Sequence, residues 1–508
     1  MSYSKSAIAA TLQQIDLGQS VAEADNLLEE ARIETSAFAD ILHDRVDLVP
    51  GTKGSGKSAL FRMFVDFLPN YLLEQRKVVV AHGVQAPGDP VFHAYTDQFE
   101  KLTDDEFVSF WSIYLVSLAH EHFIKSEKYT HFLREAGSEI QAFRKACERA
   151  RIPEIEARKS LRDVLNWTFN VLRQWRPKLK VTPPGDVGEF EVDLFGQPVT
   201  RQAESAEDKE LPKYAHEVKD ALEAVLTKCN LSLWLMVDRL DEVFPRRSDV
   251  EQRALRGLLR AMRYFSSSRV RVKIFLRDDM LEHLVTSEDG FTALTHVAVR
   301  QADPLKWSEE QLLTLLVKRL FANDALTSLL NVNREQIAAS AAYRHDCFYK
   351  VFPKTVFKGS NQSNTLRWIL SRCEDARGVV TPRDVLDLVL RAIQHEQTLC
   401  MGDTDGSNDY ILSSASLVYG YEELSKKKRV TYLQAEFPHL WEFIQRFVGG
   451  KTEYDEDALV EVLGSDWKNT VDKLVAVGFL SKWRKSDSDV YSIPFLYRPG
   501  LDLIRGRA

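Results

Sequence analysis

The sequence has few of the features that mark membrane, secreted or zinc-binding proteins. It contains no run of about 18 apolar residues, so we expect no helix that crosses a membrane. The opening Met-Ser-Tyr-Ser-Lys-Ser lacks the apolar core of a signal peptide, which favours a cytoplasmic protein. The five cysteines lack Cys-x-x-Cys spacing and the twelve histidines lack zinc-ligand spacing. We therefore expect free thiols and no structural zinc.

Strong charge of either sign is also missing. The 508 residues are 44% hydrophobic and 28% charged, with a formal net charge of −7. This composition is typical of a soluble globular chain with two to four domains. A mildly acidic chain argues against a large nucleic-acid footprint, although a local basic patch would still allow one. Nucleic acid is therefore not the favoured partner.

Residues 51 to 58 read Gly-Thr-Lys-Gly-Ser-Gly-Lys-Ser, which is a complete phosphate-binding loop motif. A short apolar run precedes it and an amphipathic helical pattern follows, as the motif requires. Glycines let the backbone turn N–H groups toward phosphate, the lysine reaches the β- and γ-phosphates, and the serine ligates Mg²⁺. The alternative is a chance glycine-rich turn. The predicted contacts with ATP are made by Gly51, Thr52, Lys53, Gly54, Ser55, Gly56, Lys57, Ser58 and Ala59, with Ser58 also on Mg²⁺.

A second motif supplies acidic residues. The apolar run 231–237 has strand length and ends in Asp238. An Asp at the end of a buried strand beside a phosphate loop is suited to orient Mg²⁺. Asp241 or Glu242 could then activate the attacking water. The alternative is a solvated acidic turn after a core strand.

Two arginines are candidates for contact with the γ-phosphate. Arg277 ends the predicted strand 270–276, and Arg383 lies in a Thr-Pro-Arg-Asp sequence that predicts a helix start. For each arginine a plain ion pair is the open alternative. Arg277 could pair with the aspartates that follow it, and Arg383 with Asp384 or Asp387.

The order of strands and helices predicts an α/β fold with a parallel sheet, because strands alternate with helical stretches. Further predicted elements are a helical stretch at 7–45, a strand at 77–81, helices from 90 to 175, a hairpin-like loop at 177–212 and helices at 307–393. The predicted organisation is an N-terminal helical segment at 1–45, a phosphate-loop ATPase core at 46–305, a helical lid at 306–400 and a winged helix at 413–508. The core carries a helical insertion at about 90–212.

The C-terminal pattern indicates a winged helix. Helices are predicted at 454–463 and 466–477, followed by strands at 479–483 and 490–493. Lysines and aspartates cancel on the second helix, whereas a DNA-reading helix normally carries excess Lys and Arg. Basic spots remain at residues 426–429 and in the predicted wing. Packing within the chain or between subunits is favoured over DNA contact.

In this order the motifs resemble those of STAND and AAA+ ATPases. The pattern Lys-Gly-Ser-Gly-Lys-Ser at 53–58 and Asp-Arg-Leu-Asp-Glu at 238–242 is similar to bacterial ATPases found in antiviral (anti-phage) defence systems. The resemblance covers roughly residues 20–60, 230–390 and the C-terminal domain. It implies a Mg²⁺-dependent ATPase that switches with its nucleotide, a homo-oligomer, and a separate effector protein as partner.

One departure from the family affects the chemistry. Many relatives place an acidic residue directly after the metal-binding Asp, whereas this chain has Arg239. The catalytic base would then be Asp241 or Glu242, or hydrolysis would be slow. Two alternatives therefore stay open: a DNA-binding ATPase of the origin-recognition or transposition-regulator type, and a scaffold that binds ATP without turnover.

Overall fold

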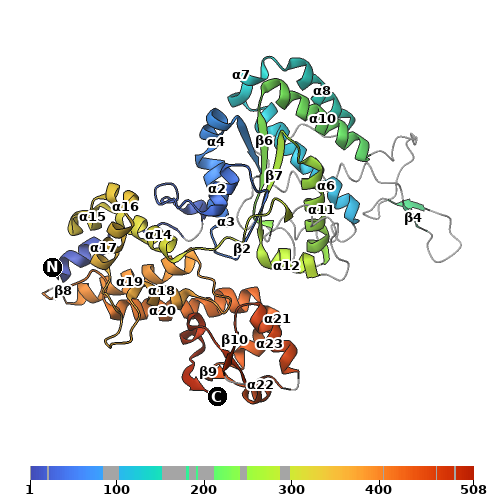
Figure 1. The fold of residues 1–508 in the computed structure, drawn as a ribbon. Coiled ribbons are helices and arrows are strands. Elements are labelled where there is room, and N and C mark those ends of the chain that lie inside the picture. The colour runs from blue at the N-terminus through green and yellow to red at the C-terminus, as the bar shows by residue number, and fades with distance from the viewer. Residues whose placement is uncertain are drawn as a thin grey trace. The chain divides into compact units, whose positions relative to one another are not determined.

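The computed structural model describes most of the chain, divided into two units (Figure 1). The described residues are 2–19, 22–83, 102–150, 179–181, 190–192, 211–240, 249–286, 298–403, 405–464, 466–485 and 488–508. Unit 1 comprises Met1–Thr35, Gly54–Gly56 and Lys306–Ala508, and unit 2 comprises Ser36–Lys53 and Lys57–Leu305. Within the described residues, no helix is both long and apolar enough to span a bilayer.

A parallel sheet, with four strands among the residues that the structure describes, forms the centre of unit 2. The strands are β2 (Leu48–Gly51), β3 (Val78–His82), β6 (Ser232–Val237) and β7 (Val270–Arg277), in the order β2-β7-β6-β3. Nearly all of their residues are buried, which explains why the strands are predominantly apolar, although β7 also contains Arg271, Lys273 and Arg277. The predicted strands at 77–81, 231–237 and 270–276 are confirmed, and with them the α/β fold.

The outer edge of β2 is covered by an extended segment that follows Arg300. The Asp47 amide donates to the Arg300 carbonyl at 2.7 Å, and the Ala302 amide donates to the Leu48 carbonyl at 2.8 Å. The Leu305 amide donates to the Pro50 carbonyl at 2.9 Å. These bonds satisfy the edge of the strand that leads into the phosphate loop.

Helices flank the sheet of unit 2 (Figure 1). Helix α6 (Asp104–Ala119) begins with a capping box at Thr103 and packs closely on α11 (Asp249–Phe265). The Trp111 indole donates to the Ala254 carbonyl at 2.8 Å. A Cβ added at Gly257 would lie 2.5 Å from the Phe107 Cβ, so this crossing requires glycine. The described part of the unit also contains the α-helices α2 (Ser36–Leu42), α3 (Lys57–Arg62), α4 (Pro69–Tyr71), α7 (Thr130–Leu133), α8 (Gly137–Arg149), α10 (Leu211–Cys229) and α12 (Asp278–Thr286).

The helices predicted at 90–175 are confirmed over 102–150; the rest of that range lies outside the described residues. Short strands β4 (Leu179–Val181) and β5 (Phe190–Val192) pair antiparallel, which confirms the hairpin-like excursion.

Unit 1 is mainly helical and holds both the N-terminal segment and the lid. Its α-helices before the C-terminal domain are α1 (Lys5–Leu12), α14 (Glu309–Phe321), α15 (Asp324–Leu330), α16 (Arg334–Ala339), α17 (Ala341–Val351), α18 (Thr365–Cys373), α19 (Pro382–Gly402) and α20 (Ser414–Lys428). Strands β1 (Tyr3–Ser4) and β8 (Ser407–Asn408) pair antiparallel. The helices predicted at 307–393 are confirmed.

The helical stretch predicted over 7–45 is largely wrong. Among the described residues of that range, only α1, α2 and a 3-10 turn at Ala22–Ala24 are helical. The side chain of Asp16 accepts from the Gly18 amide, and Gly18 has φ +76°. The buried Asp25 carboxylate pairs with Arg319 of α14 at 2.5 Å. Tertiary contacts and local side-chain bonds therefore replace the helix that the apolar spacing predicted.

The C-terminal part of unit 1 is a winged helix. Helix α21 (Pro438–Gln445) is followed by β9 (Lys451–Tyr454), α22 (Glu456–Leu463), α23 (Trp467–Ala476), β10 (Ser481–Lys485) and β11 (Ser488–Ser492). The sheet order is β10-β11-β9-β12, with β12 at Ile504–Arg507. The sequence pattern missed β9 and β12, and it assigned Tyr454 to a helix although this residue ends β9.

Candidate nucleotide-binding site

The phosphate loop connects the buried strand β2 to helix α3. Gly54 and Gly56 have φ values of +85° and +97°, a region that favours glycine because it has no Cβ. The Lys57 ammonium, at the start of α3, donates to the carbonyls of Gly51 at 2.7 Å and Thr52 at 2.8 Å. The lysine that the motif assigns to phosphate therefore already lies against the loop backbone.

Two hydroxyls of this loop are suited to donate hydrogen bonds to an oxyanion. Thr52 is 9% exposed and Ser55 is 1% exposed. Their Oγ atoms are buried, and neither has a hydrogen-bond partner among the described residues. A buried hydroxyl without a partner is costly, so a ligand oxygen here would remove a penalty. Two hydroxyls, a lysine and a helix N-terminus together fit a phosphate group.

In unit 2, two further predicted residues lie at the ends of the central strands. In register, Arg277 of β7 is opposite Gly51 of β2, so its backbone lies beside the start of the loop. Its guanidinium binds the Asp279 carboxylate through Nε at 2.9 Å and Nη2 at 2.6 Å. The ion pair that was the open alternative for Arg277 is therefore present in this structure.

Asp238 directly follows β6, which β7 separates from β2. It is 6% exposed, and the next residue, Arg239, has φ +60°. A positive φ at a residue other than glycine is uncommon and marks a sharp change of chain direction at the strand end. The Ser58 hydroxyl and the Asp238 carboxylate are oxygen donors of the kind that Mg²⁺ prefers. Asp241 and Glu242 lie outside the described residues.

In unit 1, the loop tip Gly54–Gly56 contacts the beginnings of two helices. The Trp307 indole, just before α14, donates to the Ser55 carbonyl at 2.7 Å. A Cβ added at Gly54 would lie 3.4 Å from the Thr381 Oγ1 and 3.5 Å from the Arg383 Cβ. The loop tip therefore lies beside the start of α19, close enough that a methyl group at Gly54 would be in van der Waals contact with it.

Helix α19 begins as its sequence predicts. The Thr381 side chain caps the helix by accepting from the Asp384 amide at 3.2 Å, and Pro382 is the first helical residue. Arg383 is thereby held in the first turn. The carboxylates proposed as its alternative partners bind other cations: Asp384 pairs with Lys428, and Asp387 pairs with Lys427 and Arg391.

These ion pairs also account for the basic spot predicted at 426–429. Lys426 pairs with Glu423, and the Arg429 guanidinium donates to the Gly500 carbonyl at 3.1 Å. In the wing, Lys482 pairs with Asp489 at 2.7 Å. The three lysines at 426–428 and Lys482 of the wing are thus paired with carboxylates of the same unit.

Sequence reasoning missed Trp307 and Thr381 as residues beside the loop, and Lys428 as the partner of Asp384. Trp307 was placed only at the start of the lid, and Thr381 only as part of a helix-start pattern. Their contacts join parts of the chain that are distant in sequence, so no local pattern could have identified them.

Comparisons with known proteins add no family assignment. No family model matches the chain, and no curated protein matches it. Among solved structures, it is similar to the Aeropyrum pernix ORC2 protein in ADPNP-ADP complexes, with 13% identity, TM-score 0.38 and 91% coverage of each chain. It is also similar to the Walker-type ATPase PABY2304 of Pyrococcus abyssi, with 11% identity, TM-score 0.37, and coverage of 96% of this chain and 98% of that one.

A third structure is the A. pernix ORC1 protein in complex with DNA, with 13% identity, TM-score 0.30, and coverage of 94% of this chain and 92% of that one. TM-scores of this size do not establish a common fold, so the function proposed below depends on the residues of the site.

Proposed function

We propose that this chain is a Mg²⁺-dependent ATPase that works as a nucleotide-driven switch or assembly platform. The observation that carries the proposal is the phosphate loop itself. Its lysine lies on the loop carbonyls, and its Thr52 and Ser55 hydroxyls are buried without a hydrogen-bond partner among the described residues. A surface turn with no ligand would gain nothing from burying these groups.

The proposed roles follow the chemistry of each side chain. Lys57 would bind the β- and γ-phosphates, with residues 51–59 surrounding them, and Ser58 and Asp238 would hold Mg²⁺. Bound Mg²⁺ neutralises phosphate charge in this reaction class. Asp241 or Glu242 would orient and deprotonate the attacking water.

Arg277 and Arg383 would stabilise charge on the γ-phosphate. Arg277 has to leave Asp279 to do so, which gives it two states that depend on the nucleotide. Arg383 lies on α19, and ion pairs of Asp384 and Asp387 join this helix to α20. Arg383 would therefore transmit the state of the nucleotide to the rest of unit 1.

We further propose the biological role that the motif resemblance implies. The chain would be the sensor or regulatory ATPase of a bacterial anti-phage defence system, with a separate effector protein as partner. It would act in the cytoplasm as a homo-oligomer. This role depends on the motifs at 53–58 and 238–242.

The test is phosphate release by the full chain with ATP and Mg²⁺. We expect Lys57→Ala to lower the rate by about 100-fold, as removal of a transition-state donor does, whereas Lys145→Ala on the exposed face of α8 retains it. Loss of turnover in Glu242→Gln would identify the base, and its retention would move that role to Asp241. Light scattering on the same samples measures the oligomer. Failure of the parent chain to bind ATP would overturn the proposal.

The same assays separate the two alternatives. A scaffold would retain ATP for hours without phosphate release. A DNA-binding ATPase would show ATP-dependent, salt-sensitive DNA binding.

A further inference from the structure

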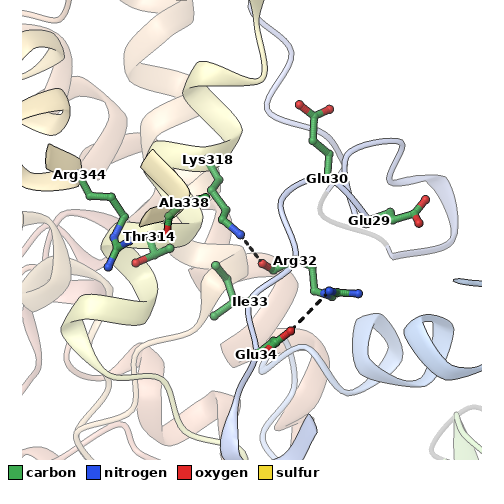
Figure 2. Close-up of a pocket in the computed structure, with 9 residues that line it drawn as sticks. All are labelled: Glu29, Glu30, Arg32, Ile33, Glu34, Thr314, Lys318, Ala338 and Arg344. Atoms are coloured by element: carbon green, nitrogen blue, oxygen red, sulfur yellow. Dashed lines mark hydrogen bonds and ion pairs between the residues drawn. The ribbon is translucent and has the colours of Figure 1, made fainter. Parts of the chain in front are cut away.

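A cavity of about 550 Å³ lies in unit 1, between the segment at residues 29–34 and the helices α14, α16 and α17 (Figure 2). Volumes of this size hold small-molecule ligands. Ile33 and Ala338 supply apolar wall, and Thr314 supplies a hydroxyl. The cavity is therefore large enough for a metabolite and has both apolar and polar lining.

The charged groups that line the cavity are three cations (Arg32, Lys318 and Arg344) and three carboxylates (Glu29, Glu30 and Glu34). The Lys318 ammonium donates to the Arg32 carbonyl at 2.8 Å. Figure 2 shows it pointing toward that carbonyl, while the carboxylates of Glu29 and Glu30 point away from it. Both glutamates are exposed. Lys318 therefore lies on the inner wall, and the two acids lie at the rim.

The two other cations of the wall, Arg344 and Arg32, differ from Lys318 because each has a carboxylate partner. Arg344 binds Glu310 through Nε at 3.2 Å and Nη2 at 3.0 Å. The side chain of Arg32 lies 3.5 Å from Glu34. For Lys318, the described part of the chain offers no carboxylate oxygen within 4.0 Å. The positive charge of this half-buried lysine is thus not balanced by a direct ion pair.

The electrostatic consequence is a depressed proton affinity. Burial lowers the pKa of Lys318, and the neighbouring cations of Arg32 and Arg344 lower it further, against a smaller opposing effect of Glu34. An anion beside the ammonium would offset both the cost of burial and the repulsion from the two arginines.

We propose that this cavity binds a small phosphorylated molecule, with Lys318 contacting its phosphate and Ile33 and Thr314 contacting its body. Lys318 is the cation of this lining without a carboxylate at ion-pair distance among the described residues, so we expect the charged group of the ligand beside it. A phosphate offers this ammonium more acceptor oxygens than a carboxylate does. The exposed glutamates at the rim would disfavour larger polyanions. This ligand is separate from the nucleotide of the phosphate loop, and the proposal does not depend on ATP hydrolysis.

Helix α14 connects the position of Lys318 to the phosphate loop. Lys318 lies on α14, about 15 Å along the helix from its N-cap, Ser308. The residue before that cap, Trp307, binds the Ser55 carbonyl. A ligand that orders α14 would therefore act on the helix that contacts the loop tip.

The experiment uses pyridoxal 5′-phosphate as the probe, because it joins a phosphate to an aldehyde that condenses with uncharged amines. The imine is reduced with borohydride, and the modified lysines are mapped by mass spectrometry. The Lys57→Ala chain is used so that the phosphate loop does not capture the probe. We expect Lys318 to be modified at least tenfold faster than the exposed Lys145 and Lys358, and inorganic phosphate to protect it.

Binding of inorganic pyrophosphate to the Lys57→Ala chain provides the second measurement. Lys318→Met should weaken it about tenfold, as loss of one charged hydrogen bond does, while Lys318→Arg retains most of the affinity and shows that the fold is intact. Lys145→Met is the matched control. Modification of Lys318 at the rate of exposed lysines, or no protection by phosphate, would overturn the proposal. Protection by ATP that requires an intact Lys57 would assign the cavity to the nucleotide site instead, which also overturns it while leaving the proposed ATPase standing.

Discussion

The Lys428 ammonium lies 2.8 Å from the Asp384 carboxylate, and the two side chains are only 13% and 5% exposed. Asp384 directly follows Arg383, in the first turn of α19, while Lys428 ends α20. The two helices pack closely, since a Cβ added at Gly420 of α20 would clash with the Leu388 carbonyl of α19. This ion pair therefore holds the turn that carries Arg383 against α20.

Breaking this pair should destabilise unit 1. Lys428→Met leaves a buried carboxylate without its lysine, and we expect the free energy of unfolding to fall by about 3 kcal/mol. Denaturant titration measures the change. The matched control is Lys426→Met, two residues earlier, whose pair with Glu423 is 60% exposed on the lysine side. Its effect should stay within about 0.5 kcal/mol. Equal effects of the two variants would contradict a structural role for the Asp384 pair.

Substitution of Gly54 should impair nucleotide binding through the backbone. Gly54 has φ +85°, and an added Cβ would contact Thr381 at 3.4 Å and Arg383 at 3.5 Å. We expect Gly54→Ala to cost about 1 kcal/mol in stability and to weaken ATP binding, measured by fluorescence titration. Gly137→Ala is the control, because nothing lies within 4 Å of its added Cβ. Unchanged ATP affinity in Gly54→Ala would show that the loop tip tolerates a different backbone.

A buried charge network at the start of β2 should be essential for folding. Lys273 is 0% exposed and donates to Asp44 at 2.8 Å and to Asp47 at 3.2 Å, while Arg300 Nε binds Asp47 at 2.6 Å. Asp47→Ala removes one carboxylate from two cations. We expect a loss of about 3–5 kcal/mol in the free energy of unfolding, measured by thermal or urea unfolding.

The control for this network is Asp40→Ala, since the ion pair of Asp40 with Arg45 is largely exposed on the arginine side. This variant should change stability by less than about 1 kcal/mol. A small effect of Asp47→Ala would mean that Asp44 alone compensates Lys273.

Acid should destabilise unit 2 through a pair of histidines. The rings of His82 and His122 lie 4.8 Å apart. Burial lowers the pKa of His122 to about 4, helped by the neighbouring His82, and burial also lowers the pKa of His82. The unfolded chain binds protons near pH 6.5 while the folded chain does not, so stability is lost as the pH falls from about 6.5 to 4.

The size of this effect is at most about 3 kcal/mol for His122. We expect His122→Gln to flatten the stability profile between pH 7 and 5, measured by urea unfolding at each pH. His131→Asn, on an exposed position of α7, should leave the slope unchanged. A parent chain whose stability does not change over this range would disprove the assignment.

Much of the sheet and the loop could be predicted because their signals are local. Strands β3 and β6 are nearly continuous apolar runs and β7 is largely apolar apart from Arg271, Lys273 and Arg277, as expected for buried parallel strands. The phosphate loop is a contiguous motif whose glycines occupy conformations that glycine favours. The start of α19 was predictable for the same reason, since its cap and proline are adjacent in sequence.

The N-terminal segment shows where local reasoning failed. Apolar spacing predicted a helix over 7–45, but residues 25–35 lie in turns and extended chain. Asp25 is buried against Arg319, and the carbonyl of Arg32 accepts from Lys318. Partners in α14 decide the conformation, and a helix pattern carries no information about them.

By itself, the amino-acid sequence determined the α/β class, the phosphate loop and the winged helix, because periodicity and turn residues act over a few positions. Only the tertiary structure decided that Trp307 lies on Ser55 and Thr381 beside Gly54, and that Lys428 pairs with Asp384. It also decided that Lys318 faces a cavity without a carboxylate at ion-pair distance in the described part of the chain. Such contacts depend on how distant segments pack, and packing is set by the whole folded chain.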